Sequence, residues 1–294
     1  MNIGILASGG DGAGMNYCLY NLYKKLYKKH KIFLFNRGFY GLINNDILNY
    51  NFKYLKKHKN DGGIIIKTSR CKEFEMKKYQ DIAVENIVKN KIDLIIVMGG
   101  NGSFNGAKEL IVRSVKVMFI PCTIDNDVND SEYCIGFDTA CYNCANFIKH
   151  VNTTMQSFNR TCIYEAMGRE CPAIAITVGN MVDADYLYVG NSCSVENCID
   201  VLRIAKQKKD APIVILRENL VDIKYLRQEI EKKLNIDVRT CIVGYVQRGG
   251  KPTKLEKLNA KKFAETCTKN INQKNYNNSI VVKNNKFVAK KIIF

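Results

Sequence analysis

Short apolar runs that do not alternate with polar residues recur along the chain, and this pattern constrains the fold most strongly. Ile3–Ala7, Leu94–Met98 and Val117–Pro121 are three such runs, and each is followed by a glycine-rich or polar turn. Runs of this kind are typical of strands that helices cover on both faces. Helical periodicity separates them, as at Met15–Tyr27. The alternation predicts a parallel, doubly wound α/β sheet.

The same alternation continues through the second half of the chain. We predict further strands at Ile32–Phe35, Ile64–Lys67, Thr161–Ala166, Ala173–Val178, Tyr186–Val189, Ile213–Leu216 and Thr240–Val246, and helices at Ile82–Lys89, Phe104–Val112, Asp138–Val151 and Ile223–Leu234. A chain of 294 residues is long enough for two lobes. We predict one lobe from residues 1–136 and 249–294 and another from 137–248, each a mostly parallel sheet with helices on both faces.

The composition indicates a folded, cytoplasmic protein. Apolar residues make up 46% of the chain, which is enough for a packed core. A run of about 18 apolar residues is absent, as is a signal-peptide pattern at the N-terminus, so we expect no membrane contact. We expect the twelve cysteines to stay reduced, and the Cys141–Cys144 pair lacks the second pair of a zinc ribbon.

The net charge of +17 permits two interpretations. A basic protein can bind nucleic acid, but no zinc-finger, RNP-type or basic-zipper motif accompanies the charge. We therefore favour a solvated basic surface that attracts anionic metabolites and expect no nucleic-acid partner. The chain has only three histidines, His30, His58 and His150, which argues against a Ser-His-Asp mechanism.

Two glycine-rich loops follow predicted strands, where open α/β sheets bind ligands. We call Ser8–Gly14 the first glycine loop and Gly99–Ser103 the second glycine loop. Glycines let backbone N–H groups approach a phosphate, and the helix that follows adds its positive end. Neither loop has the Gly-Lys-Ser/Thr of a Walker motif. One such loop is weak evidence for a phosphate site, but two are harder to explain as packing turns.

Two further loops carry charged residues. The aspartate loop, Pro121–Asp127, has two carboxylates at i and i+2, Asp125 and Asp127. One could accept a proton and the other could lie near a metal or an arginine, although a polar Asx turn explains the pattern equally well. The arginine loop, Gln247–Gly250, places Arg248 beside two glycines, which suits a phosphate monoester.

Together these loops resemble the phosphofructokinase family in order and spacing. The motifs that carry the resemblance are SGGD-x-x-GMN, GG-x-GS, TIDND, MGR and QRGG, at Ser8–Asn16, Gly99–Ser103, Thr123–Asp127, Met167–Arg169 and Gln247–Gly250. The likeness runs from Ile3 to about Gly250. It implies an ATP-dependent 6-phosphofructokinase that phosphorylates fructose 6-phosphate at the 1-hydroxyl in glycolysis, with Mg²⁺ and ATP.

The resemblance also assigns roles to individual residues. Nucleotide contacts are implied for Gly10, Phe39, Arg70, Cys71, Gly100, Asn101, Gly102 and Ser103. Sugar-phosphate contacts are implied for Thr123, Ile124, Asp125, Arg160, Met167, Gly168, Arg169, Glu218, Arg239, Tyr245 and Arg248. Asp125 would be the base, with Thr123, Arg70, Arg169 and Asp127 also catalytic. Arg160 and Arg239 would reach the phosphate from a neighbouring subunit of a homo-oligomer, in the family usually a tetramer.

Departures from the family pattern concern the metal and the donor. Asn101 stands where the family has Asp, so we expect weaker Mg²⁺ binding at Asn101 and Asp127 and a rate lowered by roughly 10–1000-fold. Tyr245 replaces a histidine. Family members that use pyrophosphate carry Asp at the position of Gly102 and typically Lys at the position of Cys122. The resemblance therefore implies ATP as the donor.

Asn101 also leaves a second hypothesis open. The chain could be a weakly active or inactive paralogue that serves as a regulatory subunit. A sugar-phosphate kinase of other specificity and a nucleic-acid binder are the remaining alternatives.

Overall fold

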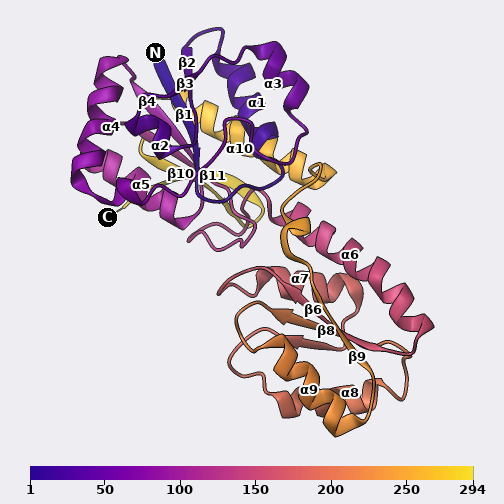
Figure 1. Ribbon diagram of the computed structural model, residues 1–294. Coiled ribbons are helices and arrows are strands. Elements are labelled where there is room, and N and C mark those ends of the chain that lie inside the picture. The colour runs from indigo at the N-terminus through magenta and orange to yellow at the C-terminus, as the bar shows by residue number, and fades with distance from the viewer. Residues whose placement is uncertain (294) are drawn as a thin grey trace. The chain divides into compact units, whose positions relative to one another are not determined.

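The computed structural model describes residues 1–293 and divides the chain into two compact units. Unit 1 comprises Met1–Thr139 and the chain from Arg248 onward, and unit 2 comprises Ala140–Gln247. The boundaries predicted from the sequence were after residues 136 and 248, whereas the two units divide after Thr139 and Gln247. Each unit has its own sheet, as Figure 1 shows.

Unit 1 contains a seven-stranded sheet in the order β11-β10-β5-β4-β1-β2-β3. The strands are β1 (Asn2–Ser8), β2 (Lys31–Phe35), β3 (Ile47–Leu48), β4 (Leu94–Gly99), β5 (Val117–Pro121), β10 (Asn278–Lys283) and β11 (Lys286–Lys291). The edge strands β3 and β11 are antiparallel to their neighbours, and the others pair in parallel. All of β4 and β5 is buried, which confirms the non-alternating apolar pattern.

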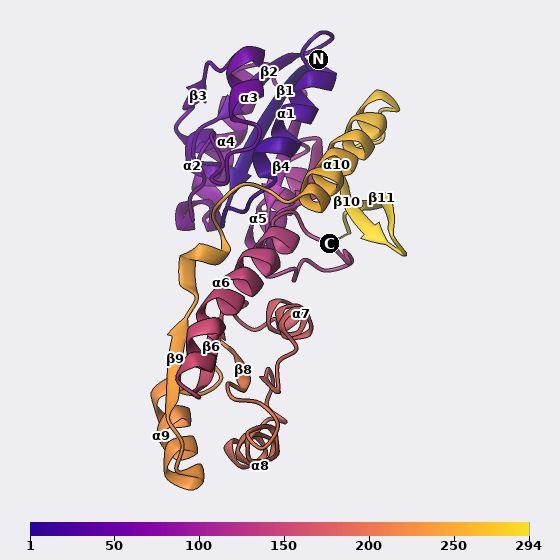
Figure 2. The same cartoon turned by 90° about the vertical axis from the view of Figure 1, so that its right-hand side faces the viewer.

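Helices cover both faces of this sheet (Figures 1 and 2). One core lies under α1 (Met15–Leu26), α3 (Phe52–His58) and α10 (Lys254–Asn272). The other lies under α2 (Phe39–Ile43), α4 (Lys77–Lys89) and α5 (Asn101–Val112). The order of elements is therefore that of a doubly wound sheet.

Unit 2 has a four-stranded parallel sheet in the order β7-β8-β6-β9. Its strands are β6 (Thr161–Ala166), β7 (Tyr186–Tyr188), β8 (Ile213–Arg217) and β9 (Val238–Ile242). The helices α8 (Val195–Ala205) and α9 (Ile223–Leu234) pack on one face. On the other face lie α7 (Ala173–Val182) and the part of α6 (Phe137–Ser157) that belongs to this unit (Figure 1).

Three of the predicted strands were wrong in whole or in part. Ile64–Lys67 forms no strand, because Lys67 N bonds back to Ile64 O in a turn while the apolar side chains still reach the core. Ala173–Val178 belongs to α7, since a six-residue apolar run fits a helix as well as a strand. The strand predicted at Thr240–Val246 ends at Ile242, and a 3-10 turn, Gly244–Gln247, follows.

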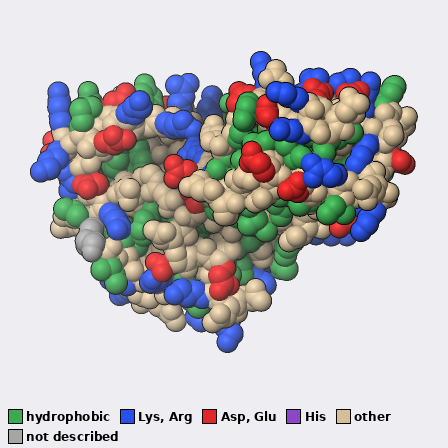
Figure 3. Space-filling model, turned by 90° about the horizontal axis from the view of Figure 1, so that it is seen from below, with side chains coloured by type: hydrophobic (Ala, Val, Ile, Leu, Met, Phe, Trp, Pro, Cys, Tyr) green, Lys and Arg blue, Asp and Glu red, His purple; other side chains and the backbone are tan. Residues whose placement is uncertain are grey.

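Charged side chains of both signs cover the side of the molecule shown in Figure 3. On the side shown in Figure 3, lysine and arginine side chains are interspersed with acidic ones and do not form one block. Across residues 1–293, no helix combines the length and apolarity that crossing a membrane requires.

Candidate active site

Three of the four loops begin at the same edge of the unit 1 sheet. Strands β1, β4 and β5 are adjacent and parallel, with Ser8 opposite Gly99 and Gly99 opposite Pro121. The first glycine loop, the second glycine loop and the aspartate loop follow these strand ends. The carboxyl edge therefore brings together loops that are between about 20 and 110 residues apart in the chain.

The two glycine loops pack too closely for side chains at the contact. Ser103 Oγ donates a hydrogen bond of 2.9 Å to Ser8 O. A Cβ built on Gly99 would lie only 2.5 Å from Ser8 O, which a real side chain could not tolerate. Cys122 N donates to Gly99 O at 2.8 Å and ties the aspartate loop to the same place. The glycines thus serve this close approach of backbones.

The aspartate loop lies against both glycine loops. A Cβ on Gly100 would lie 3.5 Å from Thr123 Cβ, and one on Gly12 would lie 3.6 Å from Ile124 Cγ2. Asp125 follows directly, is 8% exposed, and its backbone N–H donates to Thr123 Oγ1 at 3.2 Å. The aspartate loop therefore lies in contact with both glycine turns, as a base that serves a bound phosphate would require.

The two predicted metal ligands, Asn101 and Asp127, lie in contact where the second glycine loop and the aspartate loop meet. Asn101 Nδ2 donates to the backbone carbonyl of Asp127 at 3.1 Å, and both side chains are exposed. Within residues 1–293, no group of three or more His, Cys, Asp or Glu side chains is arranged to hold a metal. The oxygens of Asn101 and Asp127 nevertheless fit Mg²⁺, which is commonly held by one or two carboxylates, water and substrate phosphates.

Arg70 lies beside the first glycine loop. Gly9 N donates to Ser69 O at 3.1 Å, and Thr68 Oγ1 donates to Gly9 O at 2.9 Å, so this segment is fixed to the loop. Arg70 itself is exposed. The neighbouring Cys71 is half-buried, and burial raises the pKa of its thiol.

Phe39, unlike the exposed Arg70, lies in the hydrophobic core of unit 1. It is buried, and its ring stacks on Phe74 with centroids 4.1 Å apart. Its ring atoms also lie 2.6 Å from the position of a Cβ built on Gly106. Phe39 therefore belongs to the core beneath the site.

Arg248 of the arginine loop lies over the first glycine loop. A Cβ on Gly10 would lie 2.3 Å from Arg248 Nη2, so Gly10 makes room for the guanidinium. Arg248 Nε is buried without a hydrogen-bond partner, and Asp11 Oδ1 is 3.7 Å away. A buried guanidinium nitrogen that makes no hydrogen bond beside a glycine turn is suited to an anion.

Sequence reasoning missed Glu256, the most deeply buried carboxylate near the loops. It is 0% exposed, and a Cβ on Gly14 would lie 2.7 Å from its Cγ. Glu256 accepts hydrogen bonds from Gly136 N at 2.9 Å and from Thr139 N at 3.2 Å. Burial raises its pKa from 4.5 to about 7, although these bonds oppose the rise. The Thr-x-x-Glu pattern at Thr253 was a visible signal, because it marks a helix start.

In unit 2, the MGR turn at the end of β6 is held by two side chains. Glu218 Oε1 accepts from Gly168 N at 2.9 Å and from Arg169 N at 2.8 Å. Gln247 Oε1 accepts from Met167 N at 3.1 Å. Glu218 therefore shapes this turn, and its second oxygen is not used in these bonds.

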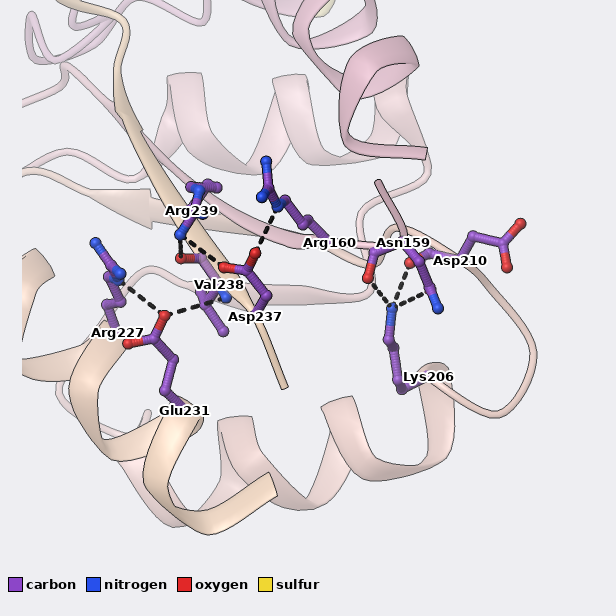
Figure 4. Close-up of polar contacts among 9 residues, drawn as sticks. All are labelled: Asn159, Arg160, Lys206, Asp210, Arg227, Glu231, Asp237, Val238 and Arg239. Carbon is purple, nitrogen blue, oxygen red and sulfur yellow. Dashed lines mark hydrogen bonds and ion pairs between the residues drawn. The ribbon is translucent and has the colours of Figure 1, made fainter. Parts of the chain in front are cut away.

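Arg160 and Arg239 share one carboxylate, that of Asp237 (Figure 4). Arg160 Nε lies 2.5 Å from Asp237 Oδ2, and Arg239 Nη1 lies 2.6 Å from Asp237 Oδ1. Sequence reasoning missed this acidic partner, although its place two residues before Arg239, directly before β9, was a signal. The group forms a cationic site whose two arginines are held by a single anion.

This arginine group and the MGR turn lie at opposite ends of the same strand. Arg160 precedes β6, whereas Met167–Arg169 follows it. A six-residue strand spans about 20 Å. Arg160 and Arg239 therefore cannot bind the same small phosphate ester as Arg169 and Glu218 of their own chain.

Tyr245, a predicted sugar-phosphate contact, lies on the 3-10 turn after β9 and is 81% exposed.

Comparisons with known proteins agree with this geometry. The fold and loops define an α/β protein built to bind phosphate groups. A family model described as phosphofructokinase matches residues 2–271. The chain is 31% identical over 292 residues to the ATP-dependent 6-phosphofructokinase of Staphylococcus aureus strain JH9, covering 98% of this chain and 91% of that protein. The chain belongs to the phosphofructokinase family.

Solved structures show the same fold. Phosphofructokinase from Saccharomyces cerevisiae matches with a TM-score of 0.88 at 24% identity, covering 99% of this chain and 44% of the yeast chain. The chain thus spans less than half of that larger protein. Pyrophosphate-dependent phosphofructokinase from Marinobacter aquaeolei matches with a TM-score of 0.82 at 15% identity, covering 98% and 81%.

Proposed function

We propose that the protein is an ATP-dependent 6-phosphofructokinase that transfers a phosphoryl group from ATP to the 1-hydroxyl of fructose 6-phosphate. The observation that carries the proposal is the junction of both glycine loops with the buried Asp125 at one sheet edge. The names of full-length bacterial relatives support the same activity. Phosphoryl transfer needs mainly positioning and charge stabilisation, which this arrangement supplies.

The nucleotide is assigned to the glycine loops. Backbone N–H groups around Gly10, Gly100 and Gly102 would receive phosphate oxygens, at the start of α1 and α5. Arg70 would stabilise the charge on the transferring group. A Cβ built on Gly102 meets nothing within 4 Å, so the second glycine loop is open to a bulky donor such as ATP. Cys71, next to Arg70, and Ser103 of the second glycine loop would complete the nucleotide contacts, and Phe39 packs in the core beside Gly106 of α5.

Asp125 is assigned as the general base. The residue is buried and its backbone N–H donates to Thr123 Oγ1, and its carboxylate would take the proton of the sugar 1-hydroxyl as that oxygen attacks phosphorus. Mg²⁺ held by Asp127 and the amide oxygen of Asn101 would neutralise charge on the nucleotide phosphates. Ile124 packs on Gly12 and keeps the loop in register.

The sugar phosphate is assigned to the MGR turn, Glu218 and Arg248. Glu218 would accept hydrogen bonds from sugar hydroxyls through the oxygen that does not hold the turn. Arg248, whose Nε makes no hydrogen bond, would bind the 6-phosphate, with Tyr245 nearby in sequence.

We assign Arg160 and Arg239 to the 6-phosphate of a second copy. Their place at the far end of β6 from Arg169 supports this assignment. At this strand end the exposed ring of Phe158 packs against the Arg160 guanidinium, and a homo-oligomer would cover it. A homotetramer and a cytoplasmic location remain predictions from the resemblance.

One assay tests the proposed function. Purified protein is given ATP, Mg²⁺ and fructose 6-phosphate, and ADP release is coupled to NADH oxidation. We expect turnover that depends on all three components. Turnover with glucose 6-phosphate but not fructose 6-phosphate would indicate another specificity, and no turnover at any Mg²⁺ concentration would favour the regulatory paralogue. Likeness to full-length enzymes does not favour that paralogue.

A further inference from the structure

Two cysteines face each other on neighbouring strands of unit 2. Cys162 lies on β6 and Cys241 on the edge strand β9, and Cys162 Sγ donates to Cys241 Sγ at 3.9 Å. In the strand register Cys162 lies opposite Arg239, and Tyr164 lies opposite Cys241. These four side chains therefore share one face of the sheet. Asn152 of α6 accepts the Tyr164 hydroxyl there, at 3.5 Å.

The two thiols differ in exposure and acidity. Cys162 is 0% exposed, whereas Cys241 is half-buried. The hydrogen bond from Cys162 lowers the pKa of Cys241 to about 7, and burial of Cys241 opposes that change. The same contact and its own burial raise the pKa of Cys162. An accessible, acidic thiol beside a buried one is the arrangement of an attacking and a resolving cysteine.

We propose that Cys162 and Cys241 are a reversible modification site, which a hydroperoxide oxidises to a disulfide. The Cys241 thiolate attacks a peroxide oxygen, the O–O bond breaks, and hydroxide leaves as a sulfenic acid forms. The Cys162 thiol then attacks the Cys241 sulfur, and its proton leaves with the displaced hydroxide as water. The two thiols lose two electrons in total, and hydrogen peroxide is reduced to two molecules of water.

Closure of this pair has a structural consequence. The sulfurs must approach from 3.9 Å to about 2.0 Å, and the two cysteines lie diagonally across the strand pair. Strand β9 is an edge strand with β6 as its one partner in the sheet, so only this one pairing has to shift for the sulfurs to meet. Arg239 lies two residues from Cys241 on β9. We therefore expect oxidation to displace Arg239 from Asp237.

Peptide mass mapping tests the pair without reference to activity. The protein is treated with hydrogen peroxide, free thiols are blocked with N-ethylmaleimide, and peptides are mapped. We expect a linked peptide pair containing Cys162 and Cys241, 2 Da lighter than the two thiol peptides, which dithiothreitol removes. C241S should abolish this species, and C193S, at another half-buried cysteine, should retain it.

Two outcomes would overturn the proposal. One is both cysteines remaining open to alkylation after peroxide treatment. The other is a dimedone adduct on Cys241 while Cys162 stays a free thiol. A second measurement rests on the proposed function: oxidation should raise the KM for fructose 6-phosphate in the wild type but not in C241S. If the linked peptide forms and KM is unchanged, the displacement of Arg239 is wrong, although the modification site stands.

Discussion

The carboxyl edge of the unit 1 sheet and the arginine group of unit 2 both present charged residues, but they are held in different ways. At the unit 1 edge, backbone contacts and glycines fix the loops, and the carboxylates Asp125 and Glu256 are buried. In unit 2, the exposed Asp237 holds Arg160 and Arg239. The first region is preorganised within one chain, whereas in the second two guanidinium groups share one exposed carboxylate.

The largest effect is expected from a substitution of Asp125, the proposed general base at the unit 1 edge. Asp125→Asn keeps the shape but removes the proton acceptor, so kcat should fall about 1000-fold. The coupled ADP-release assay measures this change. Asp130→Asn, at a surface pair with Lys290, is the control and should leave kcat unchanged. A loss of less than about tenfold, with normal circular dichroism, would contradict the assignment of Asp125.

The buried Glu256 gives a pH test of the same region. Its folded-state pKa is raised from 4.5 to about 7, so the folded protein binds the proton more tightly than the unfolded chain. The contribution of Glu256 to stability is therefore lost as pH rises from 4.5 through 7. At about 1.36 kcal/mol per pH unit, the loss is about 3 kcal/mol.

Urea unfolding of wild type and Glu256→Gln at pH 4.5, 6 and 8 measures that term. The free energy of unfolding of wild type minus that of the variant should fall by about 3 kcal/mol across this range. Glu265→Gln, on the exposed side of the same helix, should show no such trend. A difference that is independent of pH would contradict the raised pKa.

A third prediction concerns the arginine group of unit 2, Arg160 and Arg239. Arg239→Ala should raise the KM for fructose 6-phosphate by about 10–100-fold, because one charge-assisted hydrogen bond contributes about 1.5–3 kcal/mol. Arg203→Ala, at an exposed pair with Asp200, is the matched control.

Mixing subunits distinguishes a shared arginine from one that acts in its own chain. Oligomers reassembled from Asp125→Asn and Arg239→Ala chains should be more active than either parent. If the mixture is no more active than its parents, the second copy does not supply Arg239.

The smallest expected effect concerns Asn101. Asn101→Asp should raise turnover and lower the Mg²⁺ concentration at half-maximal rate by about tenfold, because a carboxylate binds the ion more tightly. The gain is at the low end of the range expected from sequence, since Asn101 also anchors the aspartate loop through Asp127 O. Asn129→Asp, on the exposed part of the same segment, controls for added charge. Unchanged Mg²⁺ dependence would remove Asn101 from the metal site.

Much of the fold was determined by the sequence alone. Strand β6 and helix α9 begin and end at the predicted residues, and the glycine-rich and aspartate loops follow β1, β4 and β5 as predicted. Such elements are readable because apolar periodicity and helix caps, such as Asp222 before α9, are local properties. The loop motifs indicated phosphate chemistry because they place glycines and aspartates at fixed spacing after strands, where backbone N–H groups can approach a phosphate.

Tertiary structure decided what local signals leave open. The apolar runs at Ile64–Lys67 and Ala173–Val178 became a turn and a helix, since burial alone does not distinguish the two from a strand. It also brought Glu256 against Gly14, joined Cys162 to Cys241, and placed Arg160 and Arg169 at opposite ends of one strand. These relations depend on distances between residues far apart in the chain, which only the packed sheets fix.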